Sequence, residues 1–218
     1  MRKRICVPMM TLCILLGGCG GRQAAEEQSI RQTYRDMVGC IMEADVACGV
    51  GTDEVLIFSL RCAYTAGGTH IVEVLAPEEV AGICAVINGD ELSVIYQDLC
   101  LPAGTLSRAE LSPAACLPWL MDALRDGWLL EQSREAVGDV PCVRLCLDES
   151  AGQVQVESAL WLREADGIPV RGELSVDGEI ILTAEFTDFR FCDTINNQVG
   201  ETAADTGGTP GTRHPVGA

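Results

Sequence analysis

The clearest evidence for the fold lies in residues 159–191, ALWLREADGIPVRGELSVDGEIILTAEFTDFRF. Apolar and polar side chains alternate through three runs, and the turn signals Asp166-Gly167 and Asp177-Gly178 separate them. A period of two is typical of half-buried strands, and Asp-Gly favours a tight hairpin turn. The stretch therefore predicts three antiparallel strands in a β-meander.

The last of these strands changes its parity. Ile180, Leu182, Ala184 and Phe186 would share one face, whereas Phe189 and Phe191 would point to the other. One extra residue in the strand restores a common face. We therefore expect a β-bulge near residues 187–188.

The period of two also appears earlier in the chain. Leu56, Phe58, Leu60, Cys62 and Tyr64 fall on one strand face. Return strands are indicated at 72–74, 92–96, 143–147 and 154–162, and the pairs at 67–68 (Gly-Gly) and 88–89 (Asn-Gly) are turn signals. Such short connections predict antiparallel neighbours.

Two segments have a helical period instead. Ile30, Tyr34, Val38 and Ile41 predict an amphipathic helix of about four turns, which extends to residues 44–46. A second helix is expected near 113–126, started either by Ser112-Pro113 or by Pro118 and stopped by Gly127. Because a proline deep inside a helix is unfavourable, Pro118 is expected to break its first turn.

These elements predict an α+β fold. In it, a curved antiparallel sheet forms an open half-barrel, and the two helices cover its concave face. The expected domain spans residues 27–192. Residues 193–218 are polar and rich in Gly and Thr, so we expect a disordered tail there.

The N-terminus has the pattern of a bacterial lipoprotein export signal. Arg2, Lys3 and Arg4 precede an apolar run of about a dozen residues, which is too short to span a bilayer as a helix. Leu16-Gly17-Gly18-Cys19 resembles a lipobox. We predict a signal peptide at 1–18, a lipid thioether on Cys19 and a polar tether over 19–26, with an ordinary secretory signal or a retained apolar anchor as the alternatives.

The mature chain is strongly acidic. Loss of the signal removes three of the 15 basic residues, which leaves 12 basic against 32 acidic residues and a net charge of 12 − 32 = −20. Such a charge argues against nucleic acid as a partner and against adhesion to anionic lipid. The lipid on Cys19 would then be the attachment to the membrane, on its extracytoplasmic face.

Nine of the twelve cysteines lie beyond the export segment, an odd number with no compact C-x-x-C spacing. This pattern does not indicate a disulfide framework or a zinc site. Cys142 and Cys146 would share a strand face about 13 Å apart, too far to bridge. We therefore expect free cysteines, some of which serve as small apolar core residues.

No catalytic, metal or cofactor site is predicted. Only His70 could serve a Ser-His-acid triad, and no Gly-x-Ser-x-Gly elbow accompanies it, so it is interpreted as a structural residue. Trp119, Trp128 and Trp161 are interpreted mainly as core residues. The alternative is that the helix and strand tryptophans face each other across an apolar cavity.

Four stretches resemble the LolA-like lipoprotein carrier superfamily, and among its members the Gram-positive GerS-like germination lipoproteins. They are the helix ending at 44–46, residues 72–83 (VEVLAPEEVAGI), residues 111–113 (LSP) and the closing meander 159–191. The resemblance implies the half-barrel fold over about residues 27–192. It also implies either a cavity for acyl chains or, for GerS-like members, partnership with a cell-wall amidase of the spore cortex.

Two functions follow from these observations. The preferred one is a membrane-anchored, non-catalytic interaction protein, because a lipid anchor restricts travel. The alternative is a binding or carrier module for lipid or lipoprotein acyl chains. The sequence assigns no ligand-binding residues to either function.

Overall fold

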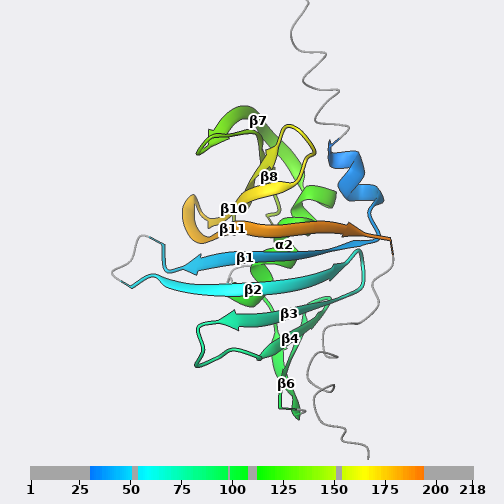
Figure 1. The fold of residues 1–218 in the computed structure, drawn as a ribbon, viewed down its shortest axis with the longest axis vertical. Coiled ribbons are helices and arrows are strands. Elements are labelled where there is room, and N and C mark those ends of the chain that lie inside the picture. Colours follow the sequence, from blue (N-terminus) through cyan, green and yellow to red (C-terminus); the bar gives the residue numbers. More distant parts are fainter. Residues whose placement is uncertain (1–29, 51–53, 98, 108–111, 151–153, 194–218) are drawn as a thin grey trace, which may run out of the picture.

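The computed structural model describes residues 30–50, 54–97, 99–107, 112–150 and 154–193. Eleven strands form one open antiparallel sheet with the order β6-β5-β4-β3-β2-β1-β11-β10-β9-β8-β7 (Figure 1). The strands are β1 (Gly39–Cys48), β2 (Leu56–Thr65), β3 (Thr69–Ala76), β4 (Cys84–Asn88), β5 (Glu91–Tyr96), β6 (Leu99–Thr105), β7 (Trp128–Val137), β8 (Val140–Asp148), β9 (Val156–Arg163), β10 (Pro169–Val176) and β11 (Glu179–Cys192). The predicted α+β half-barrel is confirmed.

The first and last strands pair with each other in the middle of the sheet. Two sequential runs of strands, β1 to β6 and β7 to β11, therefore extend in opposite directions from the β1–β11 pair. β6 and β7 form the two outer edges, at opposite ends of the molecule (Figure 1). In the sequence, the helix α2 (Pro113–Asp126) connects β6 to β7.

The predicted bulge in the last strand is confirmed. Glu43 pairs with Asp188, whereas the next residue, Ala44, pairs with Phe186, so Thr187 is the extra residue. The bulge restores the concave-facing parity, and Phe189 is buried with Leu182 and Ala184.

The predicted second helix is also confirmed, with Ser112 at its N-cap and Pro113 in its first turn. The prediction for Pro118 was wrong, because this proline lies inside an unbroken helix. Nearly every residue from 115 to 124 is buried, so packing on the sheet compensates for the lost hydrogen bond.

The predicted first helix was too long. Among the described residues the helical segment covers 30–36, and residues 39–48 form β1. After Gly39 the buried residues are Cys40, Met42, Ala44 and Val46, which is a strand period. Val38, expected on the helix core face, is exposed, and Ile41 lies on the opposite strand face from Cys40 and Met42.

The core lies between the concave face of the sheet and the helices. α2 packs on β1, β2, β3, β8, β9, β10 and β11. Gly172 on β10 lets the helix approach closely, because a Cβ at this position would lie 2.6 Å from Cδ1 of Leu120. Helix and sheet are therefore in direct contact at the centre of the molecule. Within the described residues, no helix is long and apolar enough to cross a membrane.

Candidate interaction site

Cys19, the predicted lipidation site, lies outside the described residues, as do the predicted tether and all of the predicted tail except Asp193. The nine cysteines beyond it are all free, as expected. Cys40, Cys62, Cys116 and Cys142 are buried, and desolvation raises the pKa of each thiol. Raised pKa values make thiolates rare, so these four are core residues rather than nucleophiles.

His70 belongs to a buried polar cluster beneath the C-terminal half of α2. Its ring stacks on Tyr64 with centroids 4.6 Å apart, and its Nδ1 accepts a hydrogen bond from the backbone N–H of Thr65. The Tyr64 hydroxyl donates to Asp122 at 2.6 Å and accepts from Arg125 at 3.1 Å. Burial lowers the pKa of His70, so the ring is neutral at pH 7.

This cluster joins β2 and β3 to α2 through the stacking contact and the hydrogen bonds described above. The contacts of His70 described above are a stacking contact with Tyr64 and a hydrogen bond from the backbone of Thr65. Among the described residues, no group of three or more His, Cys, Asp or Glu side chains is placed to hold a metal ion.

The structure contradicts the alternative in which the helix and strand tryptophans face each other across an apolar cavity. Trp119 lies on α2 within the core, whereas Trp161 lies on the convex face of β9. There the guanidinium carbons of Arg144 and Arg171 lie 5.3 and 5.5 Å from its ring centroid, and its Nε1 donates to Glu135. The interpretation of Trp128 as a core residue was wrong, because it is 75% exposed at the start of β7. These three rings do not line one cavity.

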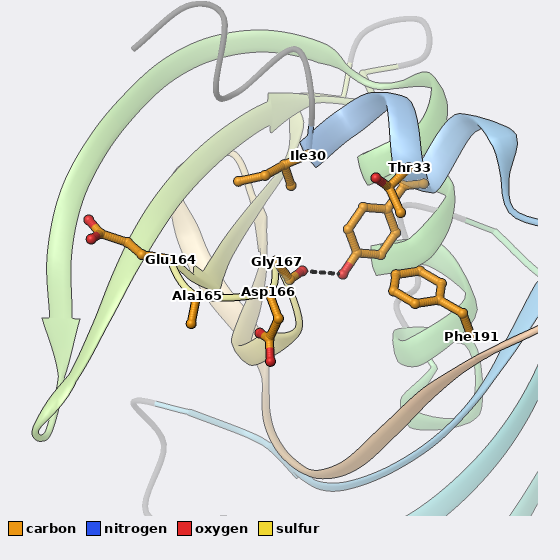
Figure 2. A pocket seen from close by; sticks show the side chains of 8 residues that line it. Ile30, Thr33, Glu164, Ala165, Asp166, Gly167 and Phe191 are labelled. Atoms are coloured by element: carbon orange, nitrogen blue, oxygen red, sulfur yellow. Dashed lines mark hydrogen bonds between the residues drawn. The ribbon is translucent and has the colours of Figure 1, made fainter. Parts of the chain in front are cut away.

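A small pocket of about 310 Å³ lies between the helical segment 30–36, the β9–β10 turn and the end of β11 (Figure 2). Tyr34 and Phe191 form its aromatic side, and the carboxylates of Glu164 and Asp166 form its polar side. Arg134 pairs with Glu164 and Arg163 pairs with Asp166. Each carboxylate of the pocket therefore already has an arginine partner within the protein.

Arginines from the same helical segment cap α2. Arg31 donates to the carbonyl oxygens of Leu124 and Gly127, at 3.3 and 2.5 Å, and Arg35 donates to that of Arg125. Helix C-termini leave their last carbonyl groups unpaired and carry partial negative charge, so cations are favourable there. The segment is therefore an integral part of the domain.

The two edges of the sheet differ in their chemistry. The sequence of β7 contains Glu131, Arg134 and Glu135, and charged side chains of this kind discourage pairing with another strand. β6 reads LCLPAGT, contains no charged residue and has all seven residues exposed. No strand pairs with its outer side among the described residues.

Apolar side chains extend from the core to this edge. Ala85 in the core pairs with Val94, and Val94 with Leu101, so all three share the concave face. Tyr96 and Leu99 form the next pair on the same face. We call Val94, Tyr96, Leu99 and Leu101 the β5–β6 patch. Its last three members are 48%, 58% and 52% exposed, so α2 leaves this end of the sheet uncovered.

No protein-family model matches the chain, and no curated protein sequence is significantly similar to it. Its structure is similar to that of the LolA superfamily protein NE2245 from Nitrosomonas europaea, with 11% identity, a TM-score of 0.42, and coverage of 78% of this chain and 94% of that one. It is also similar to an uncharacterised conserved protein from Thermus thermophilus, with 15% identity, a TM-score of 0.46, and coverage of 84% and 96%.

A third similar structure is that of the CwlD amidase from Clostridioides difficile in complex with the GerS lipoprotein, with 16% identity, a TM-score of 0.35, and coverage of 88% of this chain and 100% of that one. A LolA superfamily protein and a complex of the GerS lipoprotein are thus among the structures similar to this one. At these identities the likeness concerns the fold alone.

Proposed function

We propose that this chain is a membrane-anchored, extracytoplasmic interaction protein without catalytic activity of its own. The uncharged free edge of β6 carries this proposal. Natural sheets usually protect their edges with charges, as β7 does, and an unprotected edge beside an apolar patch is typical of a surface that binds another molecule.

The lipid anchor on Cys19 is part of the proposal. Residue 30, the first described residue, follows Cys19 by eleven positions, a span of at most ~40 Å when fully extended. The domain would therefore stay near the membrane surface. A tether of this length suits a protein that holds a partner beside the membrane better than one that shuttles between membranes.

The partner that we propose is a peptidoglycan amidase of the cell wall. This choice rests on the sequence resemblance to GerS-like lipoproteins. The CwlD–GerS complex is a property of those two proteins, and for this chain an amidase partner is a hypothesis to be tested.

Binding of lipid or lipoprotein acyl chains is the second candidate, and the β5–β6 patch is the observation that favours it. An acyl chain could cover these exposed side chains on the concave face. Against it, the centre of the concave face is filled, because Leu120 of α2 packs directly over Gly172.

The test is affinity capture of the full-length, lipidated protein from its native membrane after gentle solubilisation. Mass spectrometry would identify both co-purified proteins and extracted lipids. We expect a peptidoglycan amidase in a fixed stoichiometric ratio. A bound lipid or acylated protein, recovered reproducibly without a protein partner, would refute the interaction role and support the carrier.

A further inference from the structure

We propose that β6 is a strand-addition site, at which the partner adds an extended, basic segment to the free edge of the sheet. This inference rests on the proposed function and specifies its partner surface. Strand addition uses main-chain hydrogen bonds for affinity and flanking side chains for specificity.

The direction of the peptide groups along β6 follows from its hairpin. Tyr96 and Leu99 are opposite each other across a two-residue connection, so they form a hydrogen-bonded pair. Peptide groups alternate in direction along a strand, so those of Leu99 and Leu101 face β5. The N–H and C=O of Cys100 therefore face the free side.

Pro102 agrees with this assignment. It has no N–H to donate, and prolines within sheets place their nitrogen on the free side of an edge strand. From Leu99 to Pro102, before the bulge at Ala103, the edge thus offers one donor, the N–H of Cys100, and two acceptors, the carbonyl oxygens of Cys100 and Pro102. A short partner segment of three to five residues would satisfy all three groups.

The side chains of β6 provide an apolar border for such a segment. Leu99 and Leu101 lie on the concave face next to the free edge, and both are more than half exposed. An added strand would place its own concave-facing side chains beside them. Apolar residues at alternate positions of the partner segment would therefore be favoured.

Charge determines the rest of the partner's chemistry. The chain has no Lys or Arg between Arg61 and Arg108, a span that includes β3, β4, β5 and β6. Its acidic residues are Glu73, Glu78, Glu79, Asp90, Glu91 and Asp98. Two copies of this half of the sheet would repel each other, whereas a segment with Lys or Arg beside its apolar residues would be attracted.

The first experiment uses the full chain after the predicted signal peptide, with a random twelve-residue peptide library displayed on phage as the probe. Selected peptides are then measured against Cys100→Pro, which removes the outward N–H of residue 100, and against Cys100→Ala, which keeps it. We expect selected peptides to contain Lys or Arg beside alternating apolar residues. Their affinity should be unchanged by Cys100→Ala and about tenfold weaker with Cys100→Pro.

A second pair of variants tests the charge without a change in the backbone. Leu101→Lys and Leu101→Glu remove the same apolar side chain and add opposite charges at the edge. We expect Leu101→Lys to bind the selected basic peptides at least about fivefold more weakly than Leu101→Glu does. Thermal unfolding of all four variants would confirm that each is folded.

Several outcomes would overturn the strand addition. They are a library that yields no binder, selected peptides that are not basic, equal affinity for Cys100→Pro and Cys100→Ala, and a concentration-dependent dimer of the chain that Cys100→Pro abolishes. A partner protein that co-purifies equally with both Cys100 variants would also overturn it, yet would leave the proposed interaction role intact.

Discussion

The hydroxyl of Tyr34 donates a hydrogen bond of 2.7 Å to the carbonyl oxygen of Gly167, which fixes the helical segment 30–36 to the β9–β10 turn (Figure 2). The Tyr34 ring also contacts Phe191 edge-on, with centroids 5.4 Å apart. This residue therefore joins the beginning of the described domain to its end. Residue 30 is also where the chain arrives from the proposed lipid anchor.

Loss of this hydrogen bond should destabilise the domain. Tyr34→Phe keeps the ring and leaves the buried carbonyl of Gly167 without its donor, so we expect the free energy of unfolding to fall by about 1–2 kcal/mol. Urea denaturation would measure this change. Tyr96→Phe is the matched control, because Tyr96 is about half exposed, and its effect should stay within about 0.5 kcal/mol. Equal effects of the two substitutions would contradict the assigned role of Tyr34.

The arginine cap of α2 gives a second prediction. Arg31 is 6% exposed and donates to two carbonyl groups at the helix end, whereas Arg35 is exposed and donates to the carbonyl oxygen of Arg125. We expect Arg31→Met to lower the free energy of unfolding by about 2–3 kcal/mol and Arg35→Met by less than about 1 kcal/mol. Chemical denaturation at low ionic strength would compare them. A larger loss in the free energy of unfolding for Arg35→Met than for Arg31→Met would show that burial of Arg31 is not favourable overall.

The sequence predicted the meander and the bulge because their signals are local. Asp-Gly turns and alternating residues act within a few positions of the chain. The end of the first helix was predicted wrongly because Ile41 continues a helical period by chance. Gly39 and the alternation of buried residues from Cys40 to Val46 indicate a strand instead. Tertiary packing on both neighbouring strands then selects the extended form.

Neither edge strand was predicted from the sequence, and the reasons differ. β6 contains Pro102 and Gly104, which indicate a loop, and a proline is tolerated there only because the strand has a free side. β7, WLLEQSREAV, is rich in residues that favour helices. The interaction site could not be found from the sequence, since a free edge is a property of strand order, which depends on contacts between distant residues.

The close approach of α2 to β10 gives a third prediction. A Cβ at position 172 would lie 2.6 Å from Cδ1 of Leu120, which is fully buried and has little room to move. We expect Gly172→Ala to lower the free energy of unfolding by about 1–3 kcal/mol. Leu120→Ala alone should cost about 2–5 kcal/mol, and the double substitution should cost clearly less than the sum of the two. Strict additivity in the double-mutant cycle would show that the two residues do not meet.

The buried state of His70 predicts a dependence of stability on pH. Burial lowers the pKa of His70 from its ordinary value of 6.5, although Asp122 acts in the opposite direction. The unfolded chain therefore binds a proton before the folded chain does. The free energy of unfolding should be constant with respect to this group above pH ~6.5 and should fall as the pH drops below that value.

Denaturation midpoints at pH 7.5, 6.5 and 5.5 would measure this effect. His70→Phe is the control, because it keeps a ring to stack on Tyr64 and cannot titrate. We expect the control to be less stable at pH 7.5, since Thr65 loses its acceptor, and to show a shallower fall between pH 6.5 and 5.5. Identical slopes would mean that His70 titrates equally in both states.

The proposed anchor gives the last prediction, which separates the lipoprotein from its two alternatives. Labelling cells with palmitate should mark the wild-type chain, and Cys19→Ser should abolish the label and release the protein from the membrane fraction. A single acyl chain binds membranes only weakly, whereas the two or three chains of a bacterial lipoprotein hold it there, so the shift in fractionation should be nearly complete. An ordinary secretory signal predicts no label in either protein. A retained apolar anchor predicts membrane association in both. Label that persists in Cys19→Ser would place the lipid on another residue, and Cys100, which is exposed, would be the next position to substitute.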